Sequence, residues 1–276
     1  MIFHNSSLLV KPAAFLCVVI IAASCSNARV KKNDNIQFAI INNTRGESPY
    51  SGLGPKVLPV LKQIKDENPV FLIHLGGIIC GGENWYGVSK ADVDRQYLEI
   101  FSIILKVLPN FYTVKSETEL LNTSSEYYSK YSGKKDYYSF NCGNSHFIVL
   151  DSTQKTISDK QKEWLKNDLE ETGNLQDIFV FISDPIFIPN QYKYLNLQIC
   201  KGHELLHKHF AKHRVKAVFS GSGSVYFKSD IDGVSYINTG CGGFNKIDYN
   251  NGYCQYYVAE FKNGALRVYP KYSGIK

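Results

Sequence analysis

Several patterns that mark common protein classes are missing from this sequence of 276 residues. Its seven cysteines include no Cys-x-x-Cys spacing, so neither a zinc ribbon nor a disulfide framework is indicated. No dense run of lysine and arginine underlies the net charge of +6, and a nucleic-acid footprint normally needs such clusters. We therefore expect scattered, solvated lysines and no nucleic-acid partner.

Long apolar stretches are also missing, and the one notable run lies near the N-terminus. This run, at 12–23, is short for a transmembrane helix and ends in small residues. The segment IAASC at 21–25 resembles a relaxed bacterial lipobox. It predicts a lipoprotein signal peptide over 1–24, a lipid on Cys25 and a polar tether over 25–35. The protein would be exported and membrane-anchored, periplasmic or at the cell surface; an ordinary secretory signal is the alternative.

The remaining chain, 36–276, alternates between two hydrophobic patterns and contains no internal repeat. Short runs rich in β-branched and aromatic residues predict strands at 36–41, 69–75, 146–151, 178–183, 215–220 and 234–239. Helical spacing of apolar residues predicts helices at 55–66, 91–107, 158–172 and 202–213. This alternation predicts a single layered α/β domain.

Five segments, each containing or following an apolar stretch, carry glycine or small polar side chains. They read FAIINNTRG at 38–46, HLGGIICGG at 74–82, TVKSETE at 113–119, IFVFISDPIFIP at 178–189 and VFSGSGSVY at 218–226. In this order they resemble the ligand loops of calcineurin-like metallophosphoesterases, in the purple-acid-phosphatase-like branch. Connecting segments such as YYSFNCGNSHFIVLDS at 137–152 are similar to that branch too, so the resemblance covers about residues 36–270.

The resemblance implies an α/β/β/α sandwich with metal-ligand positions in these loops. The residues at those positions, in chain order, are Asn43, Arg45, Gly77, Glu117, Thr118, Ser183, Ser222 and Ser224. Nearly all of them bind metal poorly or not at all. Gly77 has no donor where the family has a bridging aspartate, and Arg45 brings a permanent positive charge. Serine hydroxyls are weak ligands beside imidazole and carboxylate.

Enzymes of this family use two divalent metals to polarise the phosphoryl group and generate a bridging hydroxide. With the ligands lost, we expect no cofactor and no catalytic residue. The sequence therefore predicts a pseudophosphatase that acts by binding a protein, a glycan or a phosphorylated ligand, beside a membrane. The alternative is a hydrolase with an altered or reduced metal site that uses Glu117, Glu119 and Asp184.

A cation is expected to replace the lost metals, because a buried unpaired carboxylate is costly. We predict that Arg45 pairs with Glu117, Glu119 or Asp184, since all four lie on loops that converge in the family fold. The other interpretation is that these are ordinary solvated loop charges.

A separate zinc motif is present in HELLH at 203–207, where two histidines stand one helical turn apart and Glu204 could act as a base. His213 stands at the offset of a metzincin's third ligand, but Phe210 occupies the place where those enzymes need glycine. In a continuous helix His213 lies about 15 Å along the axis from His203. A zinc peptidase with another third ligand, such as Glu260, is a third interpretation.

The sequence around HELLH favours a packing role for this helix instead of a zinc site. It resembles the helix that precedes the last phosphoesterase loop, and Leu205, Leu206 and Phe210 are expected to form its packing face.

Overall fold

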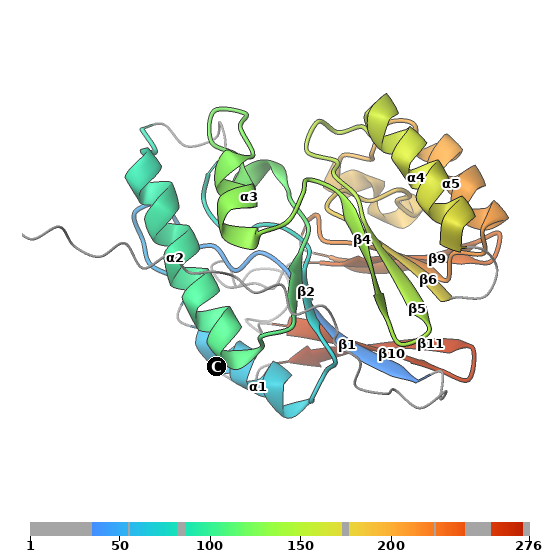
Figure 1. The fold of residues 1–276 in the computed structure, drawn as a ribbon, viewed down its shortest axis with the longest axis horizontal. Helices are drawn as coiled ribbons and strands as arrows, with labels where there is room; N and C mark the ends of the chain where they lie inside the picture. The colour runs from blue at the N-terminus through green and yellow to red at the C-terminus, as the bar shows by residue number, and fades with distance from the viewer. Residues whose placement is uncertain are drawn as a thin grey trace, which may run out of the picture.

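The computed structural model describes residues 35–54, 56–81, 87–172, 177–223, 225–240 and 255–272. The predicted signal peptide, Cys25 and nearly all of the tether lie outside this part of the chain, as do Ser224, Cys241 and Cys254. Two mixed β-sheets pack face to face, and helices cover the outer face of each (Figure 1).

The first sheet has the strand order β11-β10-β1-β2-β3. Its strands are β1 (Ile36–Ile41), β2 (Leu72–His74), β3 (Phe111–Thr113), β10 (Gln255–Lys262) and β11 (Ala265–Tyr272). β1, β2 and β3 are parallel, whereas β10 is antiparallel to β1 and β11 to β10. Its helical partners are α1 (Val57–Asp66), α2 (Lys90–Val107) and α3 (Glu126–Ser132).

The second sheet has the order β4-β5-β6-β7-β9-β8. Its strands are β4 (Tyr138–Cys142), β5 (Ser145–Val149), β6 (Asp177–Ile182), β7 (Ala217–Ser220), β8 (Tyr226–Ile231) and β9 (Val234–Thr239). The four central strands are parallel and the two edge strands antiparallel. Helices α4 (Asp159–Thr172) and α5 (His203–Lys212) cover its outer face (Figure 1).

Three separate apolar clusters fill the spaces between four layers, as the alternating side chains of β1 illustrate. Phe38 and Ile40 point into the cluster between the two sheets, which is rich in phenylalanine. Ala39 and Ile41 point the other way, into the cluster shared with α1 and α2. A third cluster joins the second sheet to α4 and α5. Because successive strand side chains face opposite sides, one strand serves two cores, and the predicted α/β/β/α order is confirmed.

The four predicted helices begin and end within two residues of the observed ones. Strands 36–41 and 234–239 match to the residue, while the strand predicted at 69–75 is confined to Leu72–His74. The sequence analysis missed α3 and five strands: β3, β4, β8, β10 and β11.

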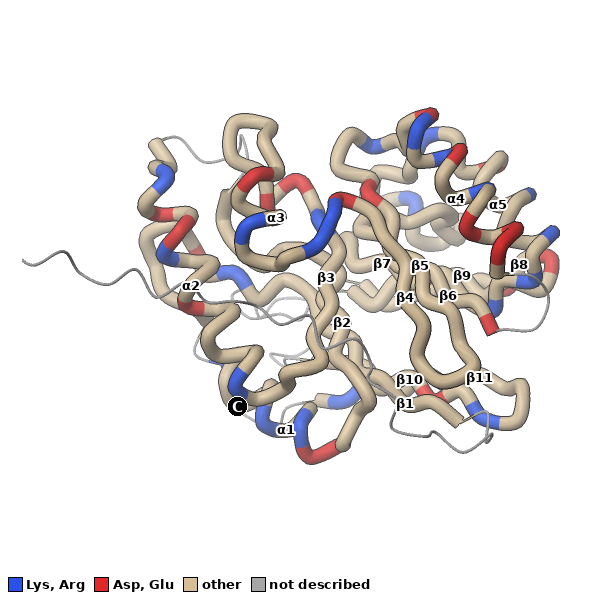
Figure 2. The backbone as a smooth tube through the Cα atoms, viewed as in Figure 1, with Lys and Arg blue, Asp and Glu red and all other residues tan. Residues whose placement is uncertain are grey.

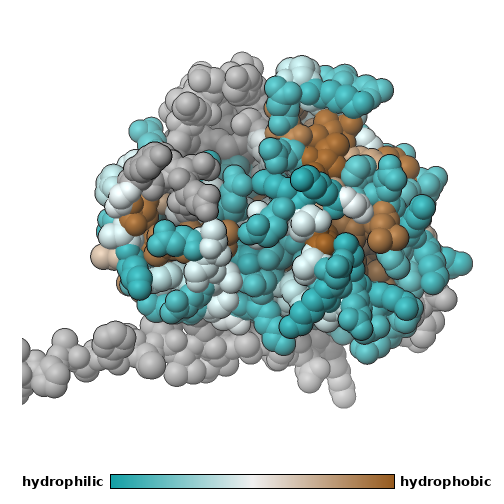
Figure 3. All heavy atoms as spheres, turned by 90° about the horizontal axis from the view of Figure 1, so that it is seen from above, coloured by the Kyte–Doolittle hydropathy of each residue, from teal (hydrophilic) through white to brown (hydrophobic). Residues whose placement is uncertain are grey.

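Positions of charged residues of both signs are interspersed along the helices and loops, and most strand segments carry none (Figure 2). Seen from above, the surface is mostly hydrophilic, and its largest hydrophobic areas lie in the half that holds α4 and α5 (Figure 3). No helix in the described part of the chain is both long and apolar enough to cross a bilayer.

Candidate functional site

The five loops singled out in the sequence converge, and backbone hydrogen bonds connect them. Asn43 N donates to Gly76 O at 2.9 Å, and Arg45 N donates to Gly77 O at 3.1 Å, which joins the first loop to the second. The fourth and fifth loops meet where Gly221 N donates to Ser183 O at 3.2 Å. Asn42 Nδ2 donates to Gly221 O at 2.9 Å and so joins the first loop to the fifth. The loops therefore gather at the carboxyl ends of the parallel strands, where α/β proteins place their sites.

The position of Gly77 has no room for a side chain. A Cβ atom there would lie 2.1 Å from Asn43 Oδ1 and 2.9 Å from Asn43 Cα, and the glycine has a φ of +76°. A positive φ strains any residue with a Cβ. The backbone at the position of the family's bridging aspartate therefore excludes an aspartate in this conformation.

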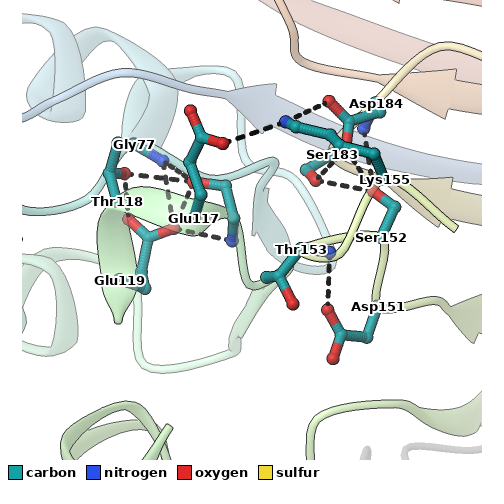
Figure 4. A network of polar contacts seen from close by, with 11 residues as sticks. Gly77, Glu117, Thr118, Glu119, Asp151, Ser152, Thr153, Lys155, Ser183 and Asp184 are labelled. Atoms are coloured by element: carbon teal, nitrogen blue, oxygen red, sulfur yellow. Dashed lines mark hydrogen bonds and ion pairs between the residues drawn. The ribbon is translucent and has the colours of Figure 1, made fainter. Parts of the chain in front are cut away.

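The buried carboxylate of Glu119 accepts hydrogen bonds from backbone amides of the second loop (Figure 4). Its Oε1 accepts from Ile78 N at 2.5 Å, and its Oε2 accepts from Gly77 N at 3.3 Å and Ser116 N at 2.7 Å. The hydroxyls of Ser116 and Thr118 donate to the same carboxylate. Glu119 ends the short 3-10 helix η1 (Glu117–Glu119), where it forms a capping box with Ser116. These bonds hold the second and third loops together.

Lys155 forms an ionic link between the third and fourth loops, as the dashed lines in Figure 4 show. Its Nζ lies 3.1 Å from Glu117 Oε2 and 3.0 Å from Asp184 Oδ1. Burial acts to lower the pKa of Lys155, but the carboxylates of Asp184 and Glu117 outweigh it and raise that pKa. The ammonium therefore stays charged.

Two serines hold the other carboxylate oxygen of Asp184. Ser152 Oγ donates to Asp184 Oδ2 at 2.8 Å and also lies 2.8 Å from Ser183 Oγ. Asp184 is buried, and this burial raises the pKa of its carboxyl while Lys155 opposes the rise. Ser183, a predicted ligand position, is thus engaged in a hydroxyl network.

Arg45 was predicted to supply the replacement cation, yet the ammonium that contacts Glu117 and Asp184 belongs to Lys155. The positive charge of Arg45 acts on the Cys80 thiol, whose pKa is raised by burial and lowered by that charge. An ion pair between Arg45 and one of the three predicted carboxylates stays a prediction.

A second lysine, Lys115, also joins the two sheets, and it is buried. It directly follows the β3 loop residue Val114, and its Nζ lies 2.7 Å from Asp136 Oδ1 and 2.9 Å from Asp151 Oδ2. Only 3% of its side chain is exposed. Lys115 and Lys155 were both missed in the sequence analysis. The signal was the loop at 151–155, which follows strand β5 at the same sheet edge as the five chosen loops.

A two-metal centre does not fit these residues. Gly77 offers neither a donor nor room for one, and the carboxylates of Glu117 and Asp184 are both paired with the ammonium of Lys155. The carboxylate of Glu119 is taken up by amides and hydroxyls of its own loops. Over the described ranges, no group of three or more His, Cys, Asp or Glu side chains lies close enough to hold a metal ion.

The HELLH segment forms the first turns of α5, but His207 already uses both ring nitrogens. Its Nδ1 lies 2.7 Å from Tyr236 Oη and its Nε2 lies 2.9 Å from Asp232 Oδ2. The ring of His203 packs edge-on against Phe187. These contacts favour a structural role for the histidines.

One detail of the predicted packing face of α5 was wrong. Leu206 and Phe210 are buried as expected, but Leu205 is 50% exposed. Leu205 directly precedes Leu206, and successive helical residues point about 100° apart, so one packing stripe does not hold both.

The comparisons with known proteins support the fold. No protein-family model matches the chain. A search of curated proteins also found no match. Among solved structures, the chain is similar to GAP50, "the anchor in the inner membrane complex of Plasmodium", with a TM-score of 0.54 and 15% identity over 88% of this chain and 89% of that one.

Weaker likenesses extend to two further structures. Vps29 from Cryptosporidium parvum matches with a TM-score of 0.43 and 10% identity, over 87% of this chain and 99% of that one. A predicted phosphoesterase from Streptococcus pneumoniae TIGR4 matches with a TM-score of 0.40 and 8% identity, over 86% of this chain and 98% of that one. The chain therefore shares with GAP50 an α/β fold, built here from two mixed sheets with helices on their outer faces.

Proposed function

We propose that this protein is a non-catalytic, metal-independent binding protein built on the metallophosphoesterase fold. One observation carries the proposal: where the fold would hold divalent cations, Lys155 places an ammonium between Glu117 and Asp184. A fixed cation in that position repels metal ions and leaves no open coordination site. Without the metals, nothing in the site generates the hydroxide or neutralises the charge that phosphoryl transfer requires.

The expected partner is a protein. The amides of Gly77 and Ile78, which could hold a phosphate group, are already bonded to Glu119. This makes a phosphorylated ligand less suited to the loops than a partner that packs on the mixed hydrophilic and hydrophobic surface of Figure 3. The structural neighbour GAP50, described as an anchor in a membrane complex, supports a binding role beside a membrane.

Hydrolysis of p-nitrophenyl phosphate and of its bis ester tests the lack of catalysis. The purified domain is assayed after incubation with zinc, manganese or iron, beside an active metallophosphoesterase treated in the same way. We expect no metal-dependent turnover above the level of an Asp184→Ala variant. Turnover that depends on metal and is lost in that variant would support the altered hydrolase instead.

Membrane attachment is proposed to occur through a lipid on Cys25. The supporting observation is the apolar run that ends in IAASC. Labelled palmitate should enter the wild-type chain and not the Cys25→Ala variant. Equal labelling of both chains would contradict lipidation at this residue.

A further inference from the structure

The Lys155 clasp, defined here as Lys155, Glu117 and Asp184, joins the two halves of the sandwich. Glu117 begins η1, which follows β3 in the first sheet, and Asp184 follows β6 in the second. Lys155 lies between β5 and α4 and reaches both carboxylates. Figure 4 shows its side chain extended toward Glu117 on one side and Asp184 on the other. One ammonium therefore spans the boundary between the sheets.

The backbone of Lys155 adopts a conformation that is uncommon for a lysine. Its φ is 57°, in the left-handed region that favours glycine, asparagine and aspartate. The conformation is fixed by a turn in which Lys155 N donates to Ser152 O at 2.7 Å, and by Lys201 N, which donates to Lys155 O at 2.8 Å. This turn places the side chain of Lys155 where its ammonium reaches both Glu117 and Asp184.

The surroundings of Asp184 show why the ammonium of Lys155 is needed. The side chain of Asp184 is only 5% exposed, and its two oxygens have different partners: Oδ2 is held by Ser152, and Oδ1 faces Lys155. Removing the ammonium would leave a buried carboxylate with no counter-charge among the contacts described, and such a charge is strongly destabilising. Glu117, with 48% of its side chain exposed, would face it across the same gap.

We propose that Lys155 is an internal replacement for a bound cation, which fixes the carboxyl edge of the sandwich in one geometry without any metal. The proposal rests on the metal-independent function proposed above and names the residue that makes the site metal-independent. It has a direct consequence. A chain that lacks this ammonium should regain an affinity for a divalent cation, since two carboxylates and nearby hydroxyls suit hard ions such as Mn2+.

Three substitutions at position 155 separate the side chain from the backbone. Lys155→Ala removes the ammonium, Lys155→Arg keeps a positive charge, and Lys155→Gly removes the ammonium while relieving the positive φ. We expect the thermal midpoint to fall by about 5 °C or more in the Ala and Gly variants and to change little in the Arg variant. If Lys155→Gly has the thermal midpoint of the wild type, the proposal is overturned, because the charge of Lys155 would then contribute nothing to stability.

The decisive step adds millimolar Mn2+ to each variant after dialysis against a chelator. Mn2+ should raise the midpoint of Lys155→Ala and leave the wild type and the Lys155→Ala/Asp184→Asn double variant unchanged. Lys166→Ala is the matched control, because Lys166 forms an exposed pair with Glu170 at 4.0 Å. It should match the wild type throughout.

The outcomes distinguish this inference from the proposed function. Absence of any Mn2+ effect on Lys155→Ala would overturn the cation replacement while leaving the binding role intact. Mn2+ bound by the wild type itself would overturn the proposed function. The Lys155→Ala variant could fail to fold without metal. In that case, folding of this variant in the presence of Mn2+, or folding of Lys155→Arg, supports the inference. If neither variant folds under these conditions, the inference is overturned.

Discussion

Gly77 shows at the scale of one residue how closely the backbones of two loops approach each other. The resemblance places a bridging aspartate here, but the backbone of this chain turns with a positive φ directly against Asn43. The first and second loops approach so closely at Gly77 that a side chain at this position would collide with Asn43.

A methyl group at this position should therefore be costly. Gly77→Ala is expected to lower the free energy of unfolding by about 2 to 4 kcal/mol, from backbone strain plus collision. Gly233→Ala is the matched control, since Gly233 has a φ of +80° and nothing within 4 Å of its Cβ position. Urea unfolding of both variants measures the difference. Equal losses would mean that strain alone is responsible and that the loops have room.

His74 should make the protein sensitive to acid. Its ring is fully buried, with Nε2 3.0 Å from Thr44 Oγ1 and Nδ1 without a partner among the described residues. Burial lowers its pKa to about 3, from an ordinary value of 6.5. Between these values the unfolded chain takes up a proton that the folded chain does not. Stability is therefore lost as the pH falls below about 6.5, by about 1.4 kcal/mol per pH unit.

Urea unfolding between pH 4.5 and 7 measures this slope. In a His74→Gln variant, the free energy of unfolding should change less steeply with pH over the same range, by about 1.4 kcal/mol per pH unit, because one proton fewer is taken up on unfolding. An unchanged slope in that variant would show that other groups carry the acid sensitivity.

At the scale of the element, η1 and the second loop form one unit through Glu119. The side chain bonds three backbone amides and two hydroxyls, so its loss would leave several buried donors unsatisfied. Glu119→Ala should cost about 3 kcal/mol or more. Glu126→Ala, an exposed carboxylate in α3, is the control and should cost little.

Hydrogen exchange provides a local measurement of the same change. The amides of Gly77 and Ile78 should lose protection in Glu119→Ala, while the strand amides of β5 keep theirs. Unchanged protection at Gly77 and Ile78 would mean that the loop is held by other contacts.

The helices and the central strands could be predicted because their patterns are local. Helix α2, for example, begins with a capping box formed by Ser89 and Asp92 and has a clear apolar stripe. Strand β10, QYYVAEFK, carries such a signal and was overlooked, whereas two other missed strands lack one. β3 is only three residues long, and β11 alternates partly exposed side chains at a sheet edge.

The site could be predicted in part for the same kind of reason. The five loops were chosen because they resemble, in chain order, the ligand loops of calcineurin-like metallophosphoesterases, and the structure brings them together. The loop at 151–155 was not among them, and Lys155 contacts Glu117 and Asp184 only because a turn in that loop carries its side chain across to them. Spacing along the chain carries no such information about a contact between two sheets.

At the scale of the whole molecule, two lysines form ion pairs that link loops of the two sheets. Lys155 connects the loops after β3 and β6, and Lys115 connects the segment after β3 with Asp136 and Asp151. The shared phenylalanine core holds the sheets together from within. The carboxyl edge is therefore closed by side chains of the chain itself.

The most direct test of this account is the metal content of the purified domain without Cys25, by elemental mass spectrometry. The protein is incubated with zinc, manganese and iron and then dialysed extensively. We predict no metal retained in stoichiometric amount and the same thermal midpoint with and without chelator. Two metal ions per chain would contradict the account, and a single zinc lost in His203→Ala would point to HELLH instead.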